Sequence, residues 1–230
     1  MSNAAAADVA ALAGRLAAKA EGAYAGLLHQ CHLSADRVFL WLMSGQWLFG
    51  ILLAVTVSPY AWEGKTRVLS NHVYAAVILG GLLSAGPIAL LILRPGWAGT
   101  RHVVAVSQML WSALLIHLTG GRIETHFHVF GSLAFLAFYR DWTVLVTATV
   151  TVAADHFLRG LLIPESVYGT SDASIYRFLE HAGWVVFEVA VLLLSIRQGL
   201  NELRRIAENG AQLEALGERL PVGAAEPMAV

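Results

Sequence analysis

The stretch VFLWLMSGQWLFGILLAVTVS, residues 38 to 58, runs for 21 residues without a charged side chain. A helix needs about 20 mostly apolar residues to cross the hydrocarbon core of a bilayer. Gln46 in this stretch and Gln108 further along the chain are uncharged, and we expect both to make hydrogen bonds between helices. The stretch therefore predicts a membrane-spanning helix.

The rest of the chain repeats this pattern, with 57% hydrophobic residues, 13% charged residues and a mean hydropathy of +0.62. Globular domains carry about 25% charged residues. We therefore expect an all-α, polytopic transmembrane helix bundle of about six spans. After residues 38–58 the predicted spans are 72–93, 102–119, 123–139, 143–163 and 179–196. The span 123–139 is short. If this segment enters and leaves the membrane on the same side, five membrane-crossing spans remain.

Lys and Arg indicate the orientation, because short cytoplasmic loops are enriched in them. With six spans, ten of the 15 basic residues fall on the side of the two termini and five on the other side. This distribution favours cytoplasmic termini.

The chain divides into four predicted segments. Residues 1–37 are Ala-rich and are expected to form an amphipathic, cytoplasmic or interfacial helix, followed by the transmembrane domain 38–196. Residues 197–220 turn charged, with an apolar stripe that predicts a cytoplasmic amphipathic helix. That stripe is compatible with a short coiled coil or with packing on the chain's own bundle. Residues 221–230 are predicted to be a disordered tail.

Motifs of soluble enzymes do not occur in the sequence. It has no phosphate-binding glycine loop, nucleophile elbow, HExxH helix or CxxC pair. The single cysteine, Cys31, excludes an internal disulfide. The sequence therefore does not indicate the chemistry of a soluble enzyme, although it leaves a membrane enzyme open, and we expect no nucleic-acid partner.

The segment GRIETHFH, residues 121–128, places imidazoles and a carboxylate where lipid should surround the chain. Ionisable groups at membrane depth are costly and mark functional sites by default. The six-span topology places further His, Asp and Glu side chains from other helices in the same outer layer. The candidate metal or ligand residues are His72, His117, Glu124, His126, His128, Asp155, His156, His181 and Glu188.

Helical spacing refines this layer. Glu124 and His128 are four residues apart and share a helix face, which we expect to be the inward one. His126 lies two residues from His128 and should point elsewhere, unless the segment begins as non-helical chain after Gly120 and Gly121.

Neutral imidazoles with neighbouring carboxylates suit a transition metal, and we expect zinc, iron or copper. A haem with two histidine ligands is the next option. A proton-responsive network without metal is a third, because imidazole titrates near neutral pH. Structural contacts that tie helices together are the alternative to all three.

Five strings also carry a resemblance to a known family. They are LIHLTGGRIETHFHVF at 115–130, FYRDW at 138–142, DHFLRG at 155–160, PESVYG at 164–169 and LEHAGWVVFE at 179–188. Together they resemble the membrane sensory region at the N-terminus of bacterial PAS-containing and hybrid histidine kinases and related receptors. The likeness covers about residues 38–205.

The resemblance implies a sensory input module in a bacterial inner membrane, whose last helix passes a signal to a cytoplasmic partner. No output domain fits after Ile196. Three functions therefore stay open: a metal- or ligand-binding sensor, an accessory subunit of a larger membrane complex, and a membrane metal-dependent oxidoreductase. Expected partners are the lipid bilayer, a second copy of the chain or other membrane subunits, and a cytoplasmic signalling protein.

Overall fold

The computed structural model describes residues 3–57, 60–63, 66–171 and 174–219. The predicted tail 221–230 lies outside these residues. The chain divides into two compact units, of which the first combines residues 1–30 with 197–230 and the second contains residues 31–196. The long helices α1 and α8 each contribute to both units.

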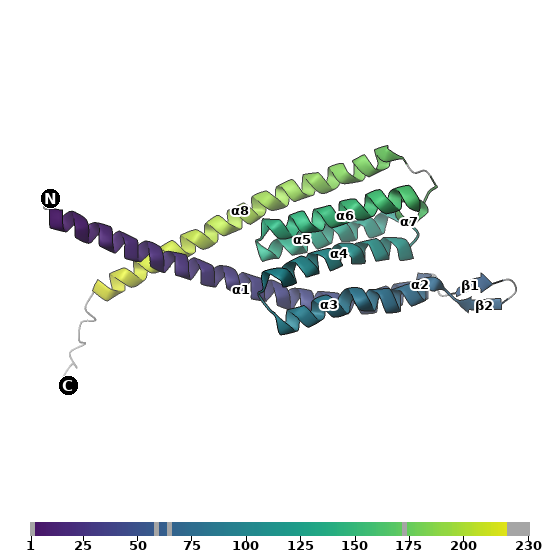
Figure 1. The fold of residues 1–230 in the computed structure, drawn as a ribbon, viewed down its shortest axis with the longest axis horizontal. Helices are drawn as coiled ribbons and strands as arrows, with labels where there is room; N and C mark the ends of the chain where they lie inside the picture. The colour runs from purple at the N-terminus through teal and green to yellow at the C-terminus, as the bar shows by residue number, and fades with distance from the viewer. Residues whose placement is uncertain (1–2, 58–59, 64–65, 172–173, 220–230) are drawn as a thin grey trace, which may run out of the picture. The chain divides into compact units, whose positions relative to one another are not determined.

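The described chain is almost entirely helical (Figure 1). Its helices are α1 (Asn3–Val57), α2 (Asn71–Tyr74), α3 (Gly80–Leu93), α4 (Ala98–Leu118), α5 (Ile123–Leu136), α6 (Trp142–Leu162), α7 (Glu165–Tyr168) and α8 (Ile175–Arg219). A π-helical turn, Ala75–Leu79, joins α2 to α3, and a 3₁₀ turn, Ala137–Tyr139, follows α5. The strands β1 (Tyr60–Glu63) and β2 (Thr66–Leu69) form a hairpin that was not predicted from the sequence, in which Tyr60 pairs antiparallel with Leu69.

Within the described residues, four helical segments are long and apolar enough to cross a membrane. They are 7–57 in α1, 71–93 from α2 through α3, 142–162 in α6 and 175–218 in α8. Many of their large apolar side chains are exposed, as a lipid-facing surface requires. The protein therefore has the helices of a membrane protein.

Helix α4 lies at the centre of the second unit, where it contacts α3, α5, α6 and α7 (Figure 1). Fourteen of its 21 residues are buried. This helix is polar as well as buried, since Ser107, Gln108 and Ser112 all lie inside the unit. Polar groups inside a bundle need partners on neighbouring helices.

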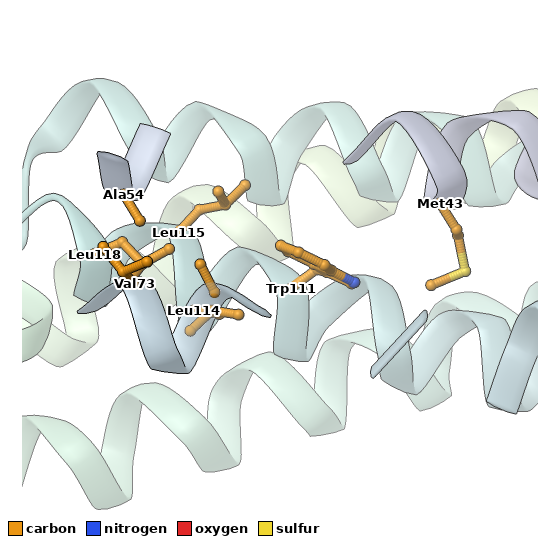
Figure 2. Packing of buried hydrophobic residues seen from close by; sticks show 8 residues of the cluster. Met43, Ala54, Val73, Trp111, Leu114, Leu115 and Leu118 are labelled. Carbon is orange, nitrogen blue, oxygen red and sulfur yellow. The ribbon is translucent and has the colours of Figure 1, made fainter. Parts of the chain in front are cut away.

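The largest buried side chain belongs to Trp111 of α4 (Figure 2). In Figure 2 its ring lies between Met43 toward one end of the bundle and Ala54, Leu115 and Leu118 toward the other. Its indole N–H donates to Ser84 Oγ at 3.0 Å, so the polar edge of the ring is paired. Gly50 of α1 and Gly80 of α3 make room for this ring, because a Cβ on either residue would lie within 3 Å of it.

Four polar side chains near the start of α4 connect α1 with the segments that precede α4 and α6. They are Asp36, Arg101, Tyr139 and Asp141, and we call them the Asp36 cluster. Asp36 accepts from Tyr139 Oη at 2.8 Å and from the backbone N–H of Gly96 at 2.6 Å. Arg101 donates to Asp141 Oδ2 at 3.1 Å. Asp141 is also the N-cap of α6. These bonds hold Asp36 of α1 beside the segments that precede α4 and α6, and they hold the start of α4 against the start of α6.

In the first unit, the N-terminal half of α1 pairs with the C-terminal half of α8. Lys19 lies 3.0 Å from Glu214 and 3.3 Å from Glu218, while the Arg204 guanidinium lies 4.9 Å from the centre of the Tyr24 ring. Positions increase along α1 as they decrease along α8, so the two helices are antiparallel.

Candidate functional site

Three histidines from three helices converge in the second unit. His126 of α5, His156 of α6 and His181 of α8 have ring centres 5.2 to 6.2 Å apart. His126 and His156 are buried, and His181 is half-buried. We call them the three-histidine cluster.

Backbone contacts fix the tautomer of two of these rings. Nδ1 of His126 lies 2.9 Å from the carbonyl oxygen of Arg122, and Nδ1 of His181 lies 2.8 Å from that of Arg177. A carbonyl oxygen only accepts, so each Nδ1 carries a hydrogen and each neutral ring keeps the lone pair of Nε2 free. Nε2 of His126 is buried and has no partner among the residues that the structure describes.

A small cavity of about 80 Å³ adjoins the cluster. Apart from the three imidazoles and Thr149, its walls are apolar. They include Val129, Phe130, Val152, Ala153, Phe178, Ala182, Val185 and Val186. The site can therefore hold a small apolar group or an ion, with imidazole nitrogens as its main polar contacts.

Tyr168 completes one side of the cluster, because its ring centre lies 5.4 Å from that of His181. Its hydroxyl is buried without a described partner. The glycine-rich turns hold α7 in place: a Cβ on Gly121 (φ +74°) would lie 2.2 Å from the backbone nitrogen of Gly169 (φ +67°). Both residues have left-handed backbone, so each must be glycine for the turns to meet.

The remaining outer-layer residues form a connected chain of contacts. Arg159 donates from two nitrogens to the carboxylate of Asp155, each at 2.7 Å, and from a third to Ser166 Oγ at 2.9 Å. Ser166 Oγ lies 2.9 Å from Nδ1 of His117, whose ring packs edge-on against His72. Asp155 Oδ2 also lies 3.3 Å from Nδ1 of His156, which joins this chain to the three-histidine cluster.

His128 belongs to a different site, in the interior of the bundle. Its Nε2 lies 2.9 Å from Gln46 Nε2, and its Nδ1 lies 2.8 Å from Ser112 Oγ. Gln108 pairs with Gln46 at 3.0 Å and accepts from Ser132 Oγ at 3.2 Å. Both nitrogens of His128 are thus used in bonds that tie α1, α4 and α5 together. Interhelical bonding by Gln46 and Gln108 is what the sequence predicted.

Two predicted carboxylates lie apart from these histidines. Glu124 is exposed, so the expectation that it shares an inward face with His128 is wrong. The rotation of α5 places His126 and His128 inward on two different sides and leaves Glu124 outside. Glu188 is half-buried, and its Oε2 has no partner among the described residues.

The structure thus brings together six of the nine candidates: His72, His117, His126, Asp155, His156 and His181. Within the described ranges, no three His, Cys, Asp or Glu side chains are placed so that they could hold a metal ion. Metal binding stays a prediction.

Sequence reasoning missed the hydroxyl groups. Ser112 and Ser132 follow Gln108 and His128 by four residues, a spacing that puts each beside its polar neighbour on one helix face. Ser166 and Tyr168 lie in the PESVYG string and had no assigned role, because nothing local indicates that α7 returns to α4 and α6.

One curated protein shows a partial similarity. A 96-residue stretch, 42% of this chain, is 30% identical to the transducer protein Htr8 of Halobacterium salinarum. The match covers 14% of that protein's length. No family model and no solved structure matches the chain.

Proposed function

We propose that this protein is a six-span membrane sensor whose three-histidine cluster receives the signal. One observation carries the proposal: α8 holds His181 in the cluster near its start and continues as a single helix to Arg219. A shift of His181 therefore moves α8, the same helix that continues into the charged residues after Ile196. The proposed signal site and the outlet lie on one continuous helix.

The two additional spans are α4 and α5 with its 3₁₀ turn. Helix α4 has 21 residues, about the length that crosses a bilayer, and it is enclosed by other helices instead of lipid. This accounts for its polar composition. An even number of spans places the ends of α1 and α8 on one side of the membrane, which we take to be the cytoplasm of a bacterial cell.

The ligand that we propose is a transition metal ion, with zinc, iron and copper as the candidates. In two of the three rings Nδ1 is held by a backbone carbonyl and the lone pair of Nε2 is left available, an arrangement that commonly orients histidine ligands. Binding requires the three rings to turn toward a common point. That movement couples α5 and α6 to α8.

The resemblance to kinase sensory regions and the similarity to a transducer support an output through a cytoplasmic partner. The charged half of α8 exposes Ile206, Leu213 and Leu216. These apolar side chains on a helix in water support such a contact.

Metal content and helix movement test the proposal together. In a Cys31→Ser background, spin labels at Ala13→Cys and Asn209→Cys report the separation of α1 and α8 in the first unit. We expect the wild-type cluster to retain about one zinc ion per chain, and zinc to shift the distance distribution. A variant with His126, His156 and His181 all replaced by Ala should show neither effect.

His29→Ala serves as the control, because it removes an exposed imidazole. Metal content and zinc response should be unchanged in this variant. A wild-type protein that retains no zinc, iron or copper and shows one fixed distance distribution contradicts the proposal. That result favours the structural alternative, in which the layer holds the bundle of an accessory subunit together.

A further inference from the structure

A second and larger recess lies away from the three-histidine cluster. It has a volume of about 330 Å³ and runs between α3, α4 and α6; we call it the α4 groove. Its apolar wall is formed by Leu79, Leu83, Leu110, Ala113, Leu114 and Ile163. Leu79 and Ile163 are 46% and 55% exposed, so the groove opens on the surface that the spanning segments present to lipid. A molecule dissolved in the bilayer can enter it directly.

Polar groups close one end of this groove. His117, Asp155, Arg159 and Ser166 all line it, and they are the members of the contact chain described above. His72 packs behind His117, and its Nδ1 is buried with no partner in the described part of the chain. The groove thus has an apolar length and a polar head region, the shape of an amphiphile's site.

The charge of this head region selects against anions. Arg159 is the positive group, and the carboxylate of Asp155 neutralises it through two bonds of 2.7 Å. A phosphate or carboxylate head would meet Asp155 as well as Arg159, and repulsion by a like charge at short range is costly. The head region is suited to a neutral ligand.

The hydrogen bonds also determine what the ligand must offer. A guanidinium only donates, so Ser166 Oγ accepts from Arg159 and can give its own hydrogen to Nδ1 of His117. Neutral His117 then carries its hydrogen on Nε2. Because His117 lines the groove, we take this N–H as the donor for a bound ligand, which then needs an acceptor such as a carbonyl oxygen.

We propose that the α4 groove binds the head of a membrane quinone. A quinone is neutral, dissolves in lipid and presents only carbonyl acceptors, which meets each of the three requirements. A hydroxyl group of the reduced quinol can also accept, but its hydrogen then needs an acceptor of its own. Both carboxylate oxygens of Asp155 already accept from Arg159, so we expect the oxidised form to bind more tightly. The groove shares no lining residue with the cavity at the three-histidine cluster, and its occupancy does not depend on the function proposed above.

Photoaffinity labelling tests this site. Wild-type protein in phosphatidylcholine nanodiscs is labelled with a short-tailed azido-quinone, and mass spectrometry locates the label. We expect label on peptides of α3, α4 and α6, competition by decylubiquinone, and at least tenfold weaker competition by decylubiquinol. Ser166→Ala removes the bridge to His117, and Ile163→Trp fills the mouth from an exposed position. Each should lower the labelling at least tenfold.

His29→Ala is the matched control, because it removes an exposed imidazole outside the groove and should leave the labelling unchanged. Ile163→Trp keeps the test decisive if Ser166→Ala folds poorly. Label that is unaffected by both groove variants, or that spreads evenly over the apolar surface, overturns the proposal. Equal competition by quinone and quinol also overturns it, because the donor argument then fails.

Discussion

At the scale of single residues, Trp111 sets the tightest steric constraint in the second unit. A Cβ on Gly50 would lie 2.7 Å from the Trp111 ring, and one on Gly80 would lie 2.8 Å from it. Atoms of a fully buried ring have little room to move aside. The indole therefore fits between α1 and the start of α3 only because Gly50 and Gly80 carry no side chain.

Gly80→Ala should therefore lower thermal stability in detergent, by about 1–3 kcal/mol as is usual for overpacking. Gly86→Ala on the same helix is the control, because a Cβ there meets no atom within 4 Å. Alanine at position 86 should keep or raise stability through its better helix propensity. Equal losses in the two variants would contradict the role assigned to Trp111.

The two histidines of the segment 121–128 show what sequence can predict at this scale. Residues two apart on a helix point in different directions, and the structure separates His126 from His128 as that spacing requires. Which neighbours each ring meets was not predictable, because it depends on how α5 is rotated against α1 and α6. For the same reason Glu124 was wrongly placed inside.

At the scale of elements, the apolar runs located the helices well. The predicted span 143–163 corresponds to α6 at Trp142–Leu162, and 102–119 corresponds to α4 at Ala98–Leu118. The hairpin was missed although strand-favouring residues such as Tyr60 and Val68 flank its turn. Helix α7 has four residues, too few for any periodicity to appear.

The Asp36 cluster leads to a prediction about pH. Burial acts to raise the pKa of Asp141, but hydrogen bonds from Thr143 and the charge of Arg101 outweigh it, so the pKa lies below its usual 3.8. A lowered carboxyl pKa contributes stability that is present above pH 3.8 and is lost as pH falls through the folded-state pKa. Asp141→Asn retains an N-cap residue for α6 while removing the charge that faces Arg101.

We therefore expect Asp141→Asn to be less stable than wild type by about 1.5–3 kcal/mol at pH 7, the range for hydrogen bonds to charged groups. The difference should shrink below pH 4, as Asp141 is protonated in the wild type. Thermal unfolding between pH 3 and 7 measures it, with the exposed Asp8→Asn as control. A difference that is constant with pH would show that the Asp141 charge is not involved.

At the scale of the whole molecule, the number of crossings decides which groups face which side. Four helical segments satisfy the length and hydropathy of a span by themselves. Helix α4 is too polar to be recognised this way because its neighbours enclose it, and α5 has only 14 residues. The count of six rests on these two helices, and so does the placing of the histidine layer on the outer side.

Cysteine accessibility tests this topology in intact cells. In a Cys31→Ser background, Thr170→Cys and Ala98→Cys place single thiols at exposed positions at opposite ends of the second unit's helices. With six spans, residue 170 lies outside the cell and residue 98 lies inside. A third variant, Asn209→Cys in the charged half of α8, also places its thiol inside. A membrane-impermeant maleimide should therefore label only Thr170→Cys, and all three should react once the cells are lysed. Labelling of Ala98→Cys in intact cells would contradict six spans, because α3 and α4 would no longer turn on the cytoplasmic side.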